Sequence, residues 1–220
     1  MTNKQIGRLL IITGALLLAA AVSLVVYNRV RSSQASEAAG RTLTKLREVI
    51  GAESSADDSS KPDIQPSGDT SSAADSSSLP DEPPAEEALE IDGEFYIGII
   101  SIPKLGLELP VARDYSEYNM SIAPSRWKGS LAGRDMIICG HNYAGFFREL
   151  DSLKAGDEIA FTDLRGRKQL YSVSYQELID GWDSEGMAAG SDSWDLTVFT
   201  CTWSGRSRVT VRAVLQNDNE

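Results

Sequence analysis

The sequence is poor in the residues that build several common kinds of site. One histidine among 220 residues excludes a metal centre made of several histidines, and two cysteines are too few for a disulfide framework. Acidic residues outnumber Lys and Arg by 32 to 21, which argues against a nucleic-acid-binding protein, because such a protein needs a basic face. The sequence contains no glycine-rich phosphate loop and no internal repeat. Any acid–base chemistry that uses imidazole must therefore use His141.

The acidic charge is concentrated in the middle of the chain. Residues 51–90 contain eleven acidic residues and one lysine, whereas residues 1–50 contain two acidic residues and seven basic ones. The middle segment also holds ten serines and five prolines. Such a composition buries too little apolar surface to offset the entropy lost on ordering, so we interpret 51–90 as an extended linker. The 130 residues that follow suffice for one compact domain, residues 91–220.

A long apolar run precedes the linker. Residues 9–27 carry no charge, and as a helix they would span about 28 Å, close to the ~30 Å hydrocarbon core of a bilayer. A cleaved signal peptide has a shorter apolar core, so we interpret residues 1–31 as an uncleaved transmembrane anchor. Residues 32–90 then form a juxtamembrane segment and the linker. Apolar residues recur at helical spacing within 34–50, yet we interpret that stretch as a spacer.

The C-terminal part of the sequence reads as a series of short strands. Runs of apolar and β-branched residues alternate with turn residues, and no strand–helix–strand rhythm is present. Roughly eight strands with one or two short helices predict a mainly β domain, either a barrel or a sandwich. The expected strands cover 96–102, 107–112, 136–140, 158–161, 169–175, 196–201 and 208–215, and the expected helical segments 116–122 and 146–153.

The residues that suggest chemistry lie at strand ends. His141 follows one predicted strand, Cys201 ends another, and Arg206 and Arg208 come shortly afterwards. Alone, a single histidine is more often structural, and a cysteine at a strand end is more often a small buried hydrophobic residue. Together, cysteine and histidine are the minimal set for an activated thiol nucleophile, and a nearby cation can stabilise an oxyanion.

A hairpin would select one of the two arginines. If residues 204–205 form its tip, Cys201 lies opposite Arg208 and Trp203 lies opposite Arg206. Directly opposite residues of an antiparallel pair share a face, with Cβ atoms ~5 Å apart. Arg208 would then stand beside the thiol, while Arg206 would lie at the tip and stack on the indole.

The other cysteine, Cys139, is predicted to be a buried strand residue without a catalytic role. It lies two residues before His141, so the two side chains share a face if the strand continues. A disulfide between Cys139 and Cys201 is the less favoured alternative.

At these positions the chain resembles the sortases, membrane-anchored cysteine transpeptidases of mainly Gram-positive bacteria. The resemblance covers about residues 95–215. Residues 98–105 are similar to the opening strand of the family, and residues 140–157 are similar to its histidine region with the Lys-x-Gly-Asp turn. Thr197-Val198-Phe199-Thr200-Cys201 resembles the Thr-Leu-x-Thr-Cys signature with valine for leucine, and Arg208 opens the last strand as the catalytic arginine does.

The resemblance implies an eight-stranded β-barrel and a thiol transpeptidation. His141, Cys201 and Arg208 would be catalytic, and Thr200 and Asn142 would bind substrate. Cys201 would form a thioester with the threonine of a Leu-Pro-x-Thr-Gly-like sorting signal on a secreted protein. An amine of a cell-wall precursor or a pilin would then resolve the thioester. The resemblance calls for no cofactor, metal or nucleic acid, and it implies a single-pass membrane protein whose catalytic domain is extracellular.

Other interpretations stay open at this point. Gly140-His141-Asn142 is reminiscent of class B sortases, and the lid motif of class C pilin polymerases is not seen in residues 51–95. A hydrolytic cysteine peptidase of another family is one alternative. Papain-like enzymes, however, place cysteine before histidine, and caspase-like enzymes need a Gln-Ala-Cys motif that this sequence lacks. The alternative from a different class is a non-catalytic binding module tethered to the cell surface.

Overall fold

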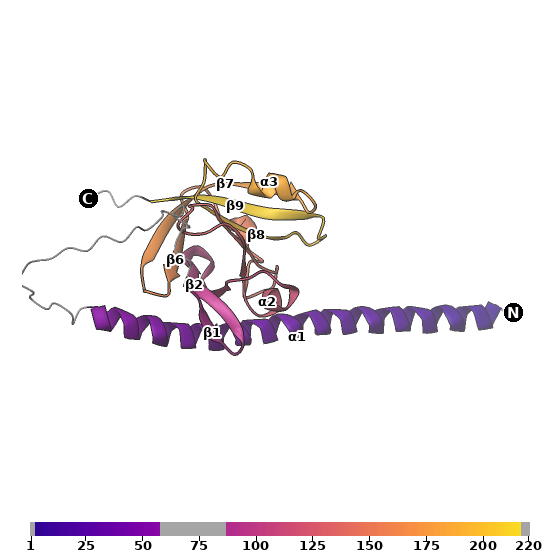
Figure 1. Ribbon diagram of the computed structural model, residues 1–220. Coiled ribbons are helices and arrows are strands. Elements are labelled where there is room, and N and C mark those ends of the chain that lie inside the picture. The colour runs from indigo at the N-terminus through magenta and orange to yellow at the C-terminus, as the bar shows by residue number, and fades with distance from the viewer. Residues whose placement is uncertain (1–2, 58–86, 217–220) are drawn as a thin grey trace, which may run out of the picture.

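The computed structural model describes residues 3–57 and 87–216 of the chain. Most of the predicted acidic linker lies outside these residues. The described part consists of one long helix, a β-barrel that packs against its C-terminal half, and short helical segments around the barrel (Figure 1).

Within the described residues, nine strands form one sheet that closes on itself. Their order is β1-β2-β3-β4-β5-β8-β9-β7-β6, and β2 also pairs with β6. Strands β2 to β9 therefore form a closed eight-stranded barrel, which confirms the mainly β prediction and decides for a barrel over a sandwich. The strands are β1 (Leu89–Ile91), β2 (Glu94–Ile102), β3 (Leu107–Ala112), β4 (Ser125–Lys128), β5 (Met136–Cys139), β6 (Glu158–Asp163), β7 (Lys168–Asp180), β8 (Leu196–Cys201) and β9 (Ser207–Leu215).

Alternation along the central strands separates the barrel interior from a second apolar layer. In β5, Met136 and Ile138 face the main core, whereas Ile137 belongs to a cluster that includes Met187 and Trp194. All four residues of β5 are buried, because the strand is covered on both faces and paired on both sides. β5 runs parallel to β8, and β8 is antiparallel to β9.

Short helical segments connect the strands. The predicted helix at 116–122 is confirmed as α2 (Glu117–Ile122), whose N-terminus is capped by the Ser116 hydroxyl accepting from the Asn119 N–H. The other segments are α3 (Ser184–Ala188), which the sequence did not predict, and the 3₁₀ turns η1 (Pro103–Leu105) and η2 (Leu150–Ser152).

The helix expected over 146–153 is wrong, because only η2 forms within this stretch. Its four apolar residues are nevertheless all buried in the main core. Phe147 packs against Gly140, where a Cβ would lie 2.5 Å from the phenylalanine ring. The chain therefore folds back on the end of β5 in successive turns and places both neighbouring phenylalanines inside.

Helix α1 (Asn3–Asp57) runs unbroken from the apolar N-terminal run into the folded domain. It is long and apolar enough to cross a membrane near the N-terminus, and the apolar side chains there are exposed, with Leu17 at 68%. The second half packs on the barrel through a buried stripe at helical spacing: Ser32, Ala35, Ala39, Thr42 and Leu46. The stretch interpreted as a spacer is therefore part of the folded unit. Ion pairs of Lys45 with Asp92 and of Arg47 with Glu108 flank the contact.

Candidate active site

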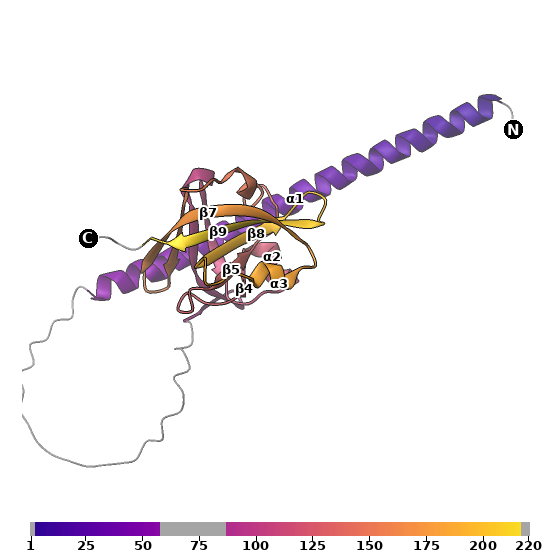
Figure 2. The same ribbon diagram turned by 90° about the horizontal axis from the view of Figure 1, so that it is seen from above.

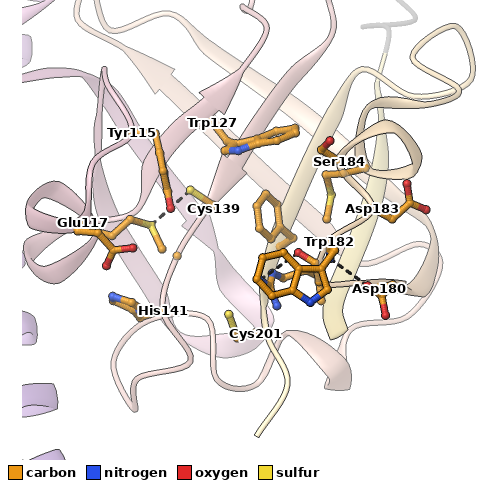
Figure 3. Close-up of a pocket in the computed structure, with 16 residues that line it drawn as sticks. Tyr115, Glu117, Trp127, Cys139, His141, Asp180, Trp182, Asp183, Ser184 and Cys201 are labelled. Carbon is orange, nitrogen blue, oxygen red and sulfur yellow. Dashed lines mark hydrogen bonds between the residues drawn. The ribbon is translucent and has the colours of Figure 1, made fainter. Parts of the chain in front are cut away.

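Two neighbouring strands bring the histidine and the partly exposed cysteine to one end of the barrel. β5 and β8 run parallel, with Cys139 paired to Phe199. His141 follows β5 by two residues and Cys201 is the last residue of β8, so both leave the sheet at the same edge. Figure 3 shows both side chains at one pocket.

The pocket is a cavity of about 420 Å³. Its apolar lining includes Met120, Trp127, Met187 and Phe199, and the ring of Trp127 meets that of Phe199 edge-on with centroids 6.0 Å apart. Its polar lining includes the candidate catalytic residues. The polar lining also includes Glu117, Asp180 and Asp183, and a cavity with both apolar walls and polar groups suits an extended peptide that must be held against a reactive group.

Arg208 also lines this cavity, and the predicted hairpin register is confirmed. Cys201 is paired directly with Arg208. The guanidinium donates from Nη1 to the carbonyl of Gly205 at 2.9 Å and from Nη2 to that of Gly181 at 3.4 Å. A side chain at Gly181 would obstruct it, since a Cβ there would lie 2.9 Å from Nη1. The ends of β7 and β8 thus hold the cation beside the cysteine.

The structure differs from expectation at the hairpin tip. The guanidinium of Arg148 lies over the Trp203 ring, 5.2 Å from its centroid, in the place expected for Arg206. Arg148 belongs to the segment that contains His141, residues 140–149, which we call the histidine loop. This loop reaches the β8–β9 tip, and the pairing of neighbouring strands in the sequence could not predict this contact.

The two residues proposed to bind substrate have other surroundings. Thr200 is buried, and its hydroxyl donates to the carbonyl of Gly140 at 2.8 Å. Its bond therefore fixes the start of the histidine loop to β8. The carbonyl of Asn142 accepts from Nε of Arg148 at 3.2 Å. Neither Thr200 nor Asn142 is one of the described residues that line the cavity.

The surroundings of His141 favour the neutral imidazole. Burial lowers the pKa of His141, the negative charge of Glu117 acts to raise it, and the positive charge of Arg31 in α1 acts to lower it. The ring lies against Tyr143, with centroids 4.7 Å apart. The backbone carbonyl accepts from the Phe147 N–H at 3.2 Å. Figure 3 shows the Glu117 carboxylate beside the imidazole.

Since the chain has one histidine, its ring titration can be followed directly by NMR. For the full chain in detergent micelles we expect an apparent pKa below 6.5. Glu117→Gln should lower the pKa further because it removes a favourable charge, and Arg31→Gln should raise it. A wild-type pKa above 6.5, or shifts of the opposite sign in the two variants, would contradict this electrostatic assignment.

Cys139 is enclosed rather than reactive. It is 1% exposed, and its thiol lies 3.3 Å from both the carbonyl of Ser125 and the sulfur of Met120. Burial raises the pKa of the Cys139 thiol to about 12. Both cysteines are free, so the less favoured alternative of a disulfide with Cys201 is not realised.

The two thiols should therefore differ in reactivity. In the folded full chain at about pH 8, iodoacetamide should modify Cys201 and leave Cys139 untouched, because a pKa near 12 leaves almost no thiolate. Peptide mapping by mass spectrometry measures this, and the same experiment in denaturant should modify both. Cys139→Ala should still incorporate one equivalent. Comparable labelling of the two cysteines in the folded chain would refute the prediction.

Sequence reasoning missed Arg212, which supports one wall of the cavity. This residue of β9 is 1% exposed, and its guanidinium lies over the Trp194 ring. It donates to the Glu177 carboxylate, the Thr197 hydroxyl and the carbonyls of Gly186 and Met187, at 2.7–3.0 Å. Arg212 thereby ties β7, β8 and α3 together. Its signal in the sequence was an even spacing from Arg208, which puts both side chains on the same face of β9.

Comparison with known proteins gives one consistent family. The family model described as Sortase domain matches residues 100–216. The curated protein "Sortase A" of Bacillus anthracis is 29% identical over 117 residues, which are 50% of this chain and 54% of that protein. The chain thus spans about half the length of this curated relative.

Solved structures agree with the fold. The Clostridium perfringens Sortase D5 transpeptidase is 26% identical, with a TM-score of 0.50, over 56% of this chain and 79% of that one. Sortase C1 from Streptococcus agalactiae is also 26% identical, with a TM-score of 0.51, over 59% of this chain and 72% of that one.

Proposed function

Because this chain belongs to the sortase family, we propose that it is a cysteine transpeptidase acting on secreted proteins that carry a Leu-Pro-x-Thr-Gly-like sorting signal. Cys201 is the proposed nucleophile, His141 the proton donor and acceptor, and Arg208 the cation at the reacting carbonyl. The acceptor is an amine of the cell wall or of a pilin.

One observation carries this proposal. The only histidine of the chain, a partly exposed cysteine and an arginine paired directly with that cysteine line the same cavity. These are the groups that thiol acyl transfer needs, and the other cysteine is too deeply buried to compete. The apolar lining gives the leucine and proline of a sorting signal a place to bind.

In the first half-reaction the Cys201 thiolate attacks the carbonyl carbon of the threonine, in the amide bond that joins the threonine to the glycine. The guanidinium of Arg208 stabilises the negative oxygen that develops. As the carbon–nitrogen bond breaks, the His141 imidazolium gives its proton to the glycine amine, which leaves a thioester on Cys201. Because burial lowers the pKa of His141, its imidazolium is a stronger acid than a solvated one and donates this proton readily.

In the second half-reaction an amine resolves the thioester. Neutral His141 takes a proton from the attacking nitrogen, a new carbon–nitrogen bond forms, and the carbon–sulfur bond breaks to release the Cys201 thiolate. The lowered pKa of His141 keeps the imidazole in the neutral form that this step requires. Thr200 acts as a positioning residue, since its hydroxyl holds the backbone immediately before His141.

The proposed arrangement in the cell follows from the candidate anchor. The apolar first half of α1 crosses the membrane once, with the N-terminus in the cytoplasm and the barrel outside, where sorting signals and cell-wall amines are found. Within this scheme residues 1–31 are the anchor, 32–90 the juxtamembrane segment and linker, and 91–220 the catalytic domain, to which β1 and the second half of α1 also contribute structure.

The test is acyl transfer by the full chain in micelles. A library of sorting-signal peptides is incubated with and without an excess of a small amine, and the products are identified by mass spectrometry. We expect a peptide adduct on Cys201 and an amine-dependent product joined at threonine. Absence of both across the library would contradict the proposal.

The same experiment separates the two alternatives. A hydrolytic peptidase would release the free threonine carboxylate in equal amounts whether or not the amine is present. A binding module would retain peptide binding but form no adduct, and it would keep its function after alkylation of Cys201.

A further inference from the structure

The second half of α1 holds the histidine loop in place. The Ser32 hydroxyl accepts a hydrogen bond from the Ala144 N–H at 3.2 Å. Next to it, Gly145 allows close approach of the helix, because a Cβ there would lie 2.2 Å from the Ser36 hydroxyl oxygen. Ala35 of α1 belongs to the same buried core as the aromatic residues of the loop. The catalytic end of the barrel is therefore fixed relative to α1.

This contact fixes the height of the histidine loop above the apolar run. The run ends at Tyr27, and Ser32 lies five residues further along an unbroken helix, which corresponds to about 7.5 Å. The polar headgroup layer on each side of a bilayer is roughly 5–8 Å thick. If the run spans the hydrocarbon core, the histidine loop therefore lies at the level of the headgroups. The guanidinium of Arg31, 5.6 Å from the ring centroid of Tyr27, belongs to the same level.

The strand ends around the cavity lie on the same side. Both views show the connection between β8 and β9 at the end of the barrel that points toward the N-terminal half of α1 (Figures 1 and 2). This connection carries Trp203, which is 82% exposed. The adjoining end of β7, paired with the start of β9 through Asp180 and Ser207, is followed by Trp182, which is 94% exposed.

Exposed indoles and cations of this kind suit a lipid headgroup layer. Tryptophan is enriched at membrane interfaces because its ring is apolar and its N–H is polar. Arg148 lies over Trp203, and Arg206 is exposed at the same tip, so cations stand beside Trp203. Trp182, in contrast, is flanked by the exposed carboxylates of Asp180 and Asp183. Trp182 also lines the cavity. In water most of the surface of both rings stays exposed, whereas in the headgroup layer they bury apolar area next to phosphates.

We infer that this end of the barrel, formed by Trp182, Trp203, Arg148 and Arg206, is a membrane-contacting surface that rests in the headgroup layer of the bilayer crossed by α1. The inference rests on the proposed anchoring by α1. As a consequence, the cavity opens at the membrane surface, where a polypeptide that is itself held in the bilayer can enter it with little extension.

The test uses tryptophan fluorescence, because α1 contains no tryptophan and all four indoles belong to the barrel domain. The full chain is placed in vesicles of phosphatidylglycerol and phosphatidylcholine whose acyl chains carry bromine next to the headgroup. Compared with ordinary lipid, we expect strong quenching of the wild-type chain. Trp182→Phe and Trp203→Phe should each lose part of the quenching, and the double variant most of it.

Trp127→Phe is the matched control, since this ring lies against Phe199 and is not part of the proposed surface, so its replacement should not reduce the quenched fraction of the emission. Equal fluorescence of the wild-type chain in brominated and ordinary vesicles would overturn the inference, and so would failure of the chain to insert into the vesicles. Neither readout needs catalysis, so loss of the proposed transpeptidase activity would not imitate either result.

Discussion

Cys201→Ala is expected to lower the rate of acyl transfer by at least about 10⁴-fold while the fold is retained, and His141→Ala is expected to cost a similar factor. In enzymes whose nucleophile and base act as one unit, removing either member abolishes nearly all of the advantage that both provide. The double variant should therefore be no slower than the single ones, and the losses should not multiply.

The structural reason is that β5 and β8 each bring one reacting group to the cavity, the imidazole after β5 and the thiol at the end of β8. Cys201 is the one described thiol that lines the cavity in a partly exposed position, and His141 is the only imidazole of the chain. With that thiol removed, the other thiol on the cavity is Cys139, whose burial raises its pKa to about 12, so no reactive thiolate is left to carry the acyl group. With the imidazole removed, the glycine amine must leave without a proton donor.

The measurement is the rate of amide formation from a sorting-signal peptide and an amine, at saturating concentrations of both. Cys139→Ala is the matched control, since it also replaces a cysteine in a neighbouring strand and should retain most of the activity. Circular dichroism and thermal unfolding establish that each variant is folded. Activity of Cys201→Ala within tenfold of wild type, or two losses that multiply in the double variant, would refute the assignment.

The sequence predicted the short strands and the β8–β9 hairpin well because their signals are local, whereas these signals left a barrel and a sandwich open and only the family resemblance implied the barrel. The strands are bounded by turn residues, and a tip placed at 204–205 sets the register, so the pairing of Cys201 with Arg208 could be predicted even though five residues separate the ends of β8 and β9. His141 and Cys201 line one cavity because β5 also pairs with β8 in parallel, which brings the ends of the two strands together. That pairing joins segments about 60 residues apart and was not predicted, and the family resemblance supplied only the joint role of His141 and Cys201.

The sequence could not predict how α1 packs. The buried stripe of the helix begins with Ser32, Ala35 and Ala39, and small residues of this kind carry little hydrophobic signal. Their burial follows from the close approach of the histidine loop at Gly145, which is a property of the tertiary structure. Arg212 was missed for a related reason, since a buried arginine is recognised only through its partners on other strands.

Arg208→Ala is expected to lower kcat by about 10²–10³-fold, the usual cost of removing a preorganised donor from an oxyanion site. The expectation follows from the register, which sets Arg208 directly opposite the nucleophile, and from two backbone carbonyls that fix its guanidinium on the cavity. Arg206→Ala is the matched control. It removes the same charge two residues away, from the exposed tip, and should change kcat on a free peptide very little.

Arg208→Lys separates geometry from charge. Lysine keeps the positive charge, but it lacks the planar fork that reaches the carbonyls of Gly205 and Gly181 while still offering an N–H to the substrate. We therefore expect Arg208→Lys to recover less than a tenth of the lost activity. Full recovery would mean that the cavity requires only a cation near Cys201. A larger loss in Arg206→Ala than in Arg208→Ala, with both variants folded, would instead place the functional arginine at the tip and overturn the role assigned to the paired residue.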